Sequence, residues 1–512
     1  MNILFFEKLI SISHMKKIFF LLCLLTTCTS LLKSQGIPYS LSCKVVKSFH
    51  PVLPSEKTLD IGRSLIIKKL VLDEWGELFY YVESGNESFK ISLRNLDNVS
   101  LDLPSSNVYL WQYIKIKSDL DVNLLKKGFQ FDLRKDLDNE TNDIIQNYNK
   151  YNLIFKDEFL VDYLQSLLYR IHLITHDDGR PGSLSIKVLI DNEPNAFCLP
   201  NGAIFINTGL LSTIRSEEEL IAVIAHEVAH FELDHHVMNV NSAVQRQKRS
   251  EFWAGFATTL AAAADVYVSS NNEYYIPGII TMATATISSE IAASAIDRLG
   301  AKYSNNQETE ADDAAILVLK FLNIDPKAMS SALSRTNNYS ISTNKFYSQS
   351  GTGSFPILEK RIEKIGIGDP EKFKNVKFDR IVSFVNSYNS QLEFEQGNIE
   401  TAKELCDRNI LAGVPTEMDY LIKSMAIRLV ANTQEEITEA LNLLIKAETL
   451  NITPLNYVNK QEGITLLRLN RNKEAVDAFN QYLNGLLQEE PSEYIQDEVL
   501  WTRKMIAKAL VL

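Results

Sequence analysis

Residues 216–236 read SEEELIAVIAHEVAHFELDHH, and this stretch organises the rest of the chain. Between positions 220 and 229 every residue except His226 and Glu227 is apolar, which predicts a buried helix. Ser216, with Glu219 three residues later, is expected to cap its first turn. Since residues four apart lie above one another on a helix, His226 and His230 present both imidazoles to one point.

The HExxH pattern predicts a zinc site. Glu227 lies beside the two histidines, where a carboxylate can take a proton from a water molecule at the metal. Two imidazoles and a carboxylate in an apolar helix would cost several kcal/mol in desolvation unless something satisfies them. A divalent metal does so, and we therefore expect a metal rather than an accidental match.

A catalytic zinc takes three protein ligands and leaves one position open, and His-His-Glu is a standard set. The stretch from Tyr303 predicts a second helix, with carboxylates at Glu308 and Asp312. Either carboxylate could complete the set. The alternative is that both belong to a solvated acidic face.

Two apolar runs, residues 184–190 and 195–211, are expected to be strands that lead into the metal helix. An edge strand beside a peptidase site can hold an extended substrate by backbone pairing. Our candidate is residues 195–200, with Asn195, Ala196 and Phe197 as the pairing residues. The alternative is an ordinary core strand.

The first 35 residues resemble a secretory signal. Two lysines after Met15 precede an apolar run from Ile18 to Leu25, and small polar residues follow. We expect export to the periplasm and cleavage near Ser34. The alternative is lipidation at Cys28, which would anchor the chain, for example at the outer membrane.

The composition of the chain limits its domain number and the classes of partner that it can bind. With 512 residues the chain is long enough for two or three domains, and its 45% hydrophobic content is typical of globular proteins. The net charge of −12 leaves no basic surplus for phosphates, so we expect no nucleic-acid partner. Three cysteines outside the signal, Cys43, Cys198 and Cys406, are too sparse for a disulfide framework and are expected to be buried.

The expected fold class is α+β and mainly helical. Domains are predicted at 36–120 (β-rich), 121–375 (a zincin-type peptidase core with a small sheet) and 376–512 (helical). Strands of the first domain are expected in IGRSLIIKKLVL, GELFYYVES, ESFKISL and SNVYLWQYIKIKS. Residues 252–300 contain two Ala- and Thr-rich runs, too interrupted for membrane spans, which predict a helical hairpin that is buried or touches a membrane surface.

The helical tail contains a repeat. Breaks at Gly397-Asn398, Asn432-Thr433 and Asn470-Arg471 are each followed by an apolar helix with an alanine, and the alanines recur every 35 to 38 residues. This approximates the tetratricopeptide (TPR) repeat, whose copies stack into a concave surface for a partner protein. The alternative is a helical tail without repeats.

Four separated motifs resemble one family. NAFCLPNGAIFINTGLL, HEVAH with His235 five residues on, ETEAD and FPILEKR are similar to the CAAX prenyl proteases and their relatives. The resemblance, over about residues 195–361, is strongest to the exported TPR-containing branch, which includes the outer-membrane assembly-enhancing peptidase. It implies zinc ligands at His226, His230 and Glu308 and a general base at Glu227. It also implies that Asp312 orients a ligand and that His235 and Arg361 support the site.

We therefore expect an exported zinc endopeptidase with one Zn²⁺ per chain, acting on protein or peptide substrates in envelope protein quality control or processing. The alternative is a TPR-type chaperone or scaffold with a quiescent peptidase module. One departure concerns regulation. Exported relatives carry a histidine six residues before the arginine that can fill the open zinc position, and here Phe355 stands there. Phenylalanine has no lone pair to donate to zinc, so we expect an unliganded position on a loop that shields the metal.

Overall fold

The computed structural model describes residues 41–72, 78–92, 95, 98–101, 110, 111, 114, 129–172, 184–244, 299, 302–343, 355–450 and 457–511. The chain forms two compact units. The first comprises residues 1–132 and 170–180, and the second comprises residues 133–169 and 181–512.

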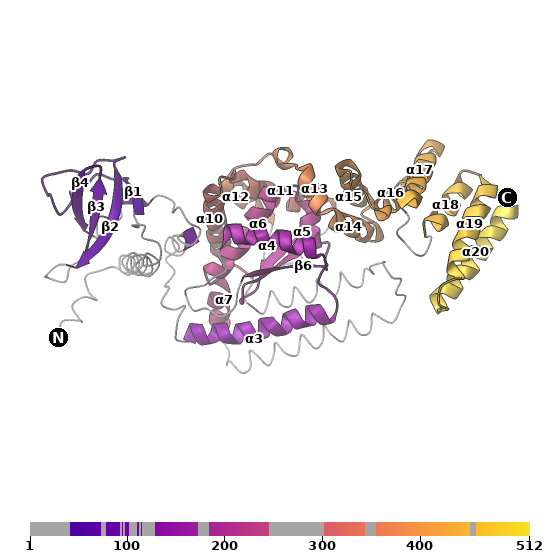
Figure 1. Cartoon of the computed structure of the whole chain (residues 1–512), viewed down its shortest axis with the longest axis horizontal. Coiled ribbons are helices and arrows are strands. Elements are labelled where there is room, and N and C mark those ends of the chain that lie inside the picture. Colours follow the sequence, from indigo (N-terminus) through magenta and orange to yellow (C-terminus); the bar gives the residue numbers. More distant parts are fainter. Residues whose placement is uncertain are drawn as a thin grey trace. The chain divides into compact units, whose positions relative to one another are not determined.

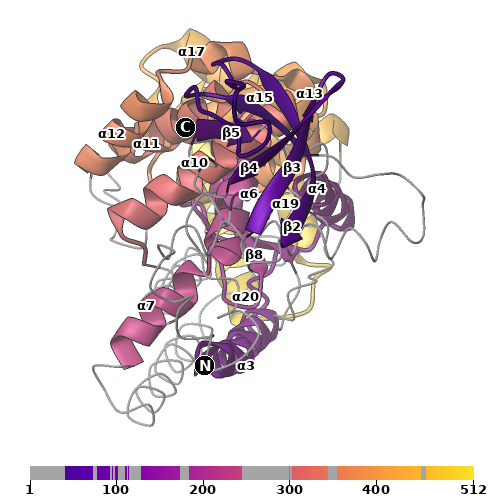
Figure 2. The same ribbon diagram turned by 90° about the vertical axis from the view of Figure 1, so that its left-hand side faces the viewer.

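The first unit contains a five-stranded antiparallel sheet, coloured indigo in Figures 1 and 2. Its order is β4-β3-β2-β1-β5, and the strands are β1 (Leu41–Val45), β2 (Ser64–Leu72), β3 (Leu78–Ser84), β4 (Glu87–Ser92) and β5 (Val99–Leu101). The first three predicted strands are therefore present. The fourth prediction is wrong, because Leu110, Trp111 and Ile114 are helical. These residues are all buried, so an apolar run with helical spacing was mistaken for a strand.

The second unit contains the small sheet expected before the metal helix. Its order is β6-β8-β7, with β6 (Ser185–Leu189) parallel and β7 (Ala196–Cys198) antiparallel to β8 (Ala203–Asn207). The run 195–211 is thus not one strand. Gly202, with a φ of 85°, turns the chain between β7 and β8, and the short helix α5 (Thr208–Thr213) follows.

Helices cover this sheet and carry the metal motif. Phe197 and Phe205 pack against α3 (Phe129–Lys150), and Ile204 and Ile206 on the opposite face of β8 are also buried. The remaining helices here are α4 (Glu158–Ile171), α6 (Glu217–Glu232), α7 (His235–Val244), α10 (Asn305–Phe321), α11 (Lys327–Ser342) and α12 (Phe355–Ile365). The predicted cap of α6 is confirmed, because the Ser216 side chain accepts a hydrogen bond from the Glu219 amide.

The tail is a series of antiparallel helices, orange to yellow in Figure 1. They are η3 (Pro370–Phe373), α13 (Val376–Ile381), α14 (Ser383–Glu395), α15 (Ile399–Ala412), α16 (Glu417–Val430), α17 (Gln434–Leu450), α18 (Tyr457–Arg468), α19 (Asn472–Leu486) and α20 (Glu493–Val511). The three predicted breaks fall between α14 and α15, α16 and α17, and α18 and α19. The alanines that follow them, Ala402, Ala440 and Ala475, are all fully buried. Helices α18 and α19 pack so closely that a Cβ on Gly463 would lie 2.5 Å from the Phe479 ring.

The fold is α+β in the coarse sense, with small sheets and mostly helices, and the three cysteines are buried and form no disulfide within the described residues. None of the described helices has the length and hydropathy required to span a bilayer. The predicted signal in residues 1–35 and the predicted hairpin in 252–300 lie outside the described residues.

Candidate active site

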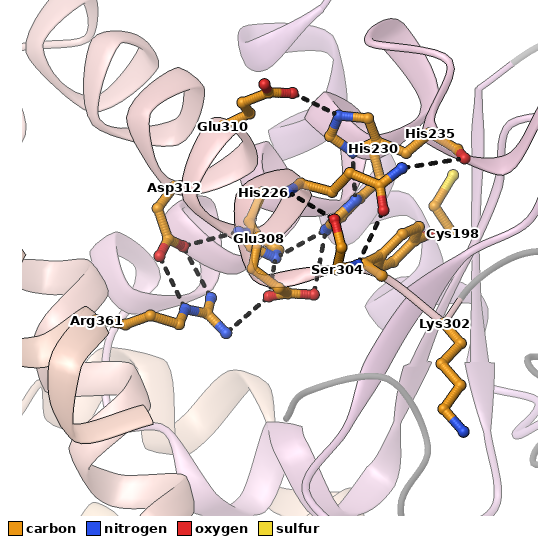
Figure 3. Close-up of polar contacts among 12 residues, drawn as sticks. Cys198, His226, His230, His235, Lys302, Ser304, Glu308, Glu310, Asp312 and Arg361 are labelled. Atoms are coloured by element: carbon orange, nitrogen blue, oxygen red, sulfur yellow. Dashed lines mark hydrogen bonds and ion pairs between the residues drawn. The ribbon is translucent and has the colours of Figure 1, made fainter. Parts of the chain in front are cut away.

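Three buried side chains converge between α6 and α10 (Figure 3). The Nε2 atoms of His226 and His230 are 3.0 Å apart. Oε2 of Glu308 lies 3.5 Å from His226 Nε2, and Oε1 lies 3.8 Å from His230 Nε2. One helical turn separates the two histidines, and the capped first turn of α10 carries the glutamate, so two rigid elements set this geometry.

An ion-paired network orients the first imidazole. Nδ1 of His226 lies 3.0 Å from Oδ1 of Asp312, one turn after Glu308 on α10. Arg361 of α12 donates two hydrogen bonds of 2.8 Å to Asp312, and its Nη1 lies 2.8 Å from Oε2 of Glu308. Although burial by itself would raise the pKa of Asp312, the guanidinium of Arg361 holds it well below its usual range. In the neutral imidazole, the proton of His226 is thereby directed to Nδ1, which leaves the Nε2 lone pair facing Glu308.

A separate chain of side chains orients the second imidazole. Nδ1 of His230 lies 2.9 Å from Nδ1 of His235, and Nε2 of His235 lies 3.2 Å from the carboxylate of Glu310. If His235 donates from Nε2 to Glu310, it accepts at Nδ1 from His230. His230 then also presents its Nε2 lone pair to the centre. Figure 3 shows Glu310 directed to His235 and away from the three converging groups.

Glu227 lies next to this centre and is buried. Its carboxylate accepts a hydrogen bond from the backbone amide of Cys198 in β7, and its Oε2 has no hydrogen-bond partner in the described part of the chain. Burial raises the pKa of Glu227 to about 7, against the opposing effect of His226. A carboxylate with this pKa can both accept and release a proton near neutral pH.

Sequence reasoning missed the residues that hold the turn after α6. Asp234 adopts a φ of 63°, and Arg134 of α3 binds its carboxylate in a buried bidentate pair. This turn places His235 behind His230, and Nε2 of His236 lies 2.7 Å from the Cys198 carbonyl oxygen. The ring of Tyr303 stacks on His230 at 3.5 Å between centroids. Arg134 is separated from Asp234 by 100 residues, and no local pattern could have paired them.

The residues present fit a divalent metal. The Nε2 atoms of His226 and His230 both point at Glu308. Neither oxygen of Glu308 accepts a well-aligned hydrogen bond from the described residues, although Arg361 lies near. Burial alone would lower the pKa of His226, but the carboxylates of Asp312 and Glu308 raise it to about 9. The centre therefore favours positive charge. Two imidazoles and a carboxylate are the donor set of a catalytic zinc site.

The candidate substrate strand, β7, is an edge strand of the small sheet within the described residues. The backbones of Asn195 and Leu199 hydrogen-bond to β8. Asn207 N donates to Asn195 O at 2.9 Å, and Leu199 N donates to Ala203 O at 2.8 Å. By the alternation of an antiparallel pair, the backbone groups of Ala196 and Cys198 face away from β8. Those of Cys198 contact Glu227 and His236. Phe197 does not face the site, because its ring is buried against Phe205.

Phe355 is the first residue of α12 rather than part of a loop. Its side chain lies outside the described part of the chain. The expectation that it shields an open metal position therefore stays a prediction.

We expect removal of Arg361 to destabilise the fold strongly, because it would leave buried charges uncompensated. Arg361→Met would leave two buried carboxylates without their cation, and breaking a buried pair of this kind typically costs about 3–5 kcal/mol. Lys364 and Asp313 form a 2.8 Å pair between the same two helices, but both side chains are nearly half exposed. Lys364→Met should therefore cost less than about 1 kcal/mol. Denaturant unfolding of the metal-free protein tests this, and equal losses in the two variants would contradict it.

Comparison with known proteins identifies the domain that holds this centre. Residues 171–366 match the profile of peptidase family M48. Mitochondrial metalloendopeptidase OMA1 of Schizosaccharomyces pombe is 25% identical over 222 residues, which cover 42% of this chain and 57% of that protein.

Two bacterial relatives are similar. A putative beta-barrel assembly-enhancing protease of Vibrio cholerae is 26% identical over 34% of this chain and 32% of its own length. Metalloprotease YcaL of Escherichia coli is 27% identical over 28% of this chain and 46% of its own length. Each match spans less than two thirds of the relative. The family match covers all of the site residues described above, from His226 to Arg361, and residues 171–366 of this chain are a peptidase family M48 domain.

Proposed function

We propose that this chain is an exported zinc endopeptidase that hydrolyses peptide bonds in protein substrates. The observation that carries the proposal is the convergence of His226, His230 and Glu308 in a buried centre, with Glu227 beside them on the helix that carries the two histidines. The match to a metallopeptidase family supports the reaction class.

The residues divide the chemistry among them. His226, His230 and Glu308 would hold the metal. A bound zinc ion supplies a Lewis acid that polarises a peptide carbonyl and makes water more acidic. Glu227 takes a proton from the attacking water and passes it to the leaving amine, for which a pKa of about 7 is suited. The outward backbone of Ala196 in β7 would pair with an extended substrate.

The place of action follows from two further considerations. The predicted secretory signal implies export, with the periplasm as the expected location. The relative in Vibrio cholerae is named for beta-barrel assembly. We therefore propose substrates among envelope proteins, with the tail repeats as a surface for a protein partner.

The purified full-length chain should contain about one zinc per chain and should cleave casein. Removing the metal with 1,10-phenanthroline should abolish cleavage, because water would lose its Lewis acid, and adding back zinc should restore it. Metal analysis and a digestion assay on the same sample measure both. A protein that binds zinc but cleaves neither casein nor short peptides would favour the alternative of a scaffold with a quiescent peptidase module.

A further inference from the structure

The loop between β6 and β7 determines where the candidate substrate strand begins. One side of this loop is hydrogen-bonded to the peptidase core. The carbonyl of Asp191 accepts hydrogen bonds from Gly209 N at 2.7 Å and from Thr208 Oγ1 at 2.8 Å. The side chain of Asn207 donates to the Glu193 carbonyl at 3.1 Å. A Cβ on Gly209 would lie 2.3 Å from the backbone of Asn192, so this close approach requires glycine.

The other side of the same loop is hydrogen-bonded to the helical tail. Nδ2 of Asn192 donates to Oε1 of Glu393 at 2.7 Å. The amides of Asn192 and Gln396 are paired by two reciprocal hydrogen bonds, of 2.9 and 3.2 Å. The hydroxyl of Tyr339 in α11 lies 3.0 Å from the Asn192 carbonyl oxygen and within hydrogen-bond distance of the Glu393 carboxylate, and these two acceptors share its single proton. Asn192 and Glu393 are almost fully buried. Glu393 and Gln396 lie in and just after α14, beyond the residues that match the M48 family.

Asn398 Nδ2 also donates to Oε2 of Glu393, at 2.7 Å. The side chains that donate to this carboxylate are therefore all neutral. The carboxylate is therefore a shared hydrogen-bond acceptor that connects the loop, α11 and the start of α15. Three residues after Asn192, Asn195 makes the first bond between β7 and β8. The opposite end of β7 is held by the contact of His236 with the Cys198 carbonyl.

We infer that α14 of the tail, through Glu393 and Gln396, positions β7 for substrate binding. Glu393 and Gln396 are positioning residues that act through Asn192 and do not touch the metal centre. The inference rests on the proposed function. It assigns α14 to the substrate side of the peptidase rather than to partner recruitment alone.

The chain offers a matched pair of variants for a test. Asn389 lies one turn before Glu393 on α14, is fully buried and also bonds to the peptidase core, through Nδ2 to Ser212 Oγ at 2.7 Å. Ser212 belongs to α5 and not to the loop before β7. Glu393→Ala and Asn389→Ala thus both remove buried contacts between the same helix and the peptidase core, and only the first removes a contact with the loop.

The assay uses full-length, zinc-loaded protein and an internally quenched extended peptide. If release of the loop leaves about a tenth of the molecules with β7 correctly placed, KM for Glu393→Ala should rise on the order of tenfold. The value of kcat should stay within about twofold. The same peptide should bind on the order of tenfold more weakly when Glu393→Ala is added to the inactive Glu227→Gln background. Asn389→Ala should change neither constant, and Glu393→Gln, which keeps an acceptor, should recover most of the affinity.

Equal KM values in Glu393→Ala and Asn389→Ala would overturn the inference, as would a fall in kcat at unchanged KM. If Glu393→Ala does not fold, Gln396→Ala removes the paired amide at the end of α14 and is judged by the same criteria. Failure of the proposed function gives a different result, because the wild-type chain would then neither cleave nor bind the peptide.

Discussion

Glu227→Gln is expected to abolish peptide hydrolysis while leaving about one zinc per chain. The carboxylate is isosteric with the amide, and the amide oxygen can still accept the hydrogen bond from Cys198 N. An amide cannot take a proton from water, and loss of general-base catalysis typically lowers the rate by about 10²–10⁴-fold. The metal should remain, because Glu227 is not among the three groups whose atoms converge.

The control is Glu218→Gln, the same chemical change in the first turn of α6, at a partly exposed residue. It should leave kcat and zinc content at wild-type values. Digestion of casein and of a quenched peptide, with metal analysis of each sample, separates the variants. Substantial activity in zinc-loaded Glu227→Gln would show that another group acts as the base.

Glu308→Ala is expected to lose both zinc and activity. Without this carboxylate only two imidazoles remain at the centre, whereas a catalytic zinc site uses three protein ligands. The change also leaves Arg361 without one of its two carboxylate partners. A thermal unfolding curve of the metal-free variant therefore belongs with the zinc measurement, to separate loss of a ligand from loss of fold.

Glu310→Ala provides the matched comparison, because Glu310 lies two residues further along α10 and its carboxylate contacts His235. The effect of Glu310 on the metal passes through His235 and His230, and its side chain is 44% exposed. We expect it to keep one zinc per chain, with affinity reduced by no more than about tenfold. Zinc and turnover retained in Glu308→Ala but lost in Glu310→Ala would reverse the assignment of the third ligand.

The metal motif could be predicted because its geometry is local. His226, Glu227 and His230 lie within one turn of a helix whose period and cap are visible in the sequence, and the Ser216 cap is present in the structure. The turns of the tail could be predicted for the same reason, since breaks at glycine and asparagine separate apolar helices. The error at Trp111 shows the limit, because a short apolar run fits either a helix or a strand.

The sequence by itself determined the site's chemistry, since the residue types and their spacing on α6 point to zinc and a general base. The resemblance implied the roles of Glu308 and Asp312, and the tertiary structure places three of the four carboxylates of α10, with Glu308 at the centre, Asp312 on His226 and Glu310 on His235. It also joins Arg134 to Asp234 and Asn192 to Glu393, pairs that are 100 and 201 residues apart. The physical reason is that helical periodicity is a local property written in consecutive residues. Contacts between distant segments depend on how whole helices pack, and no short pattern records them.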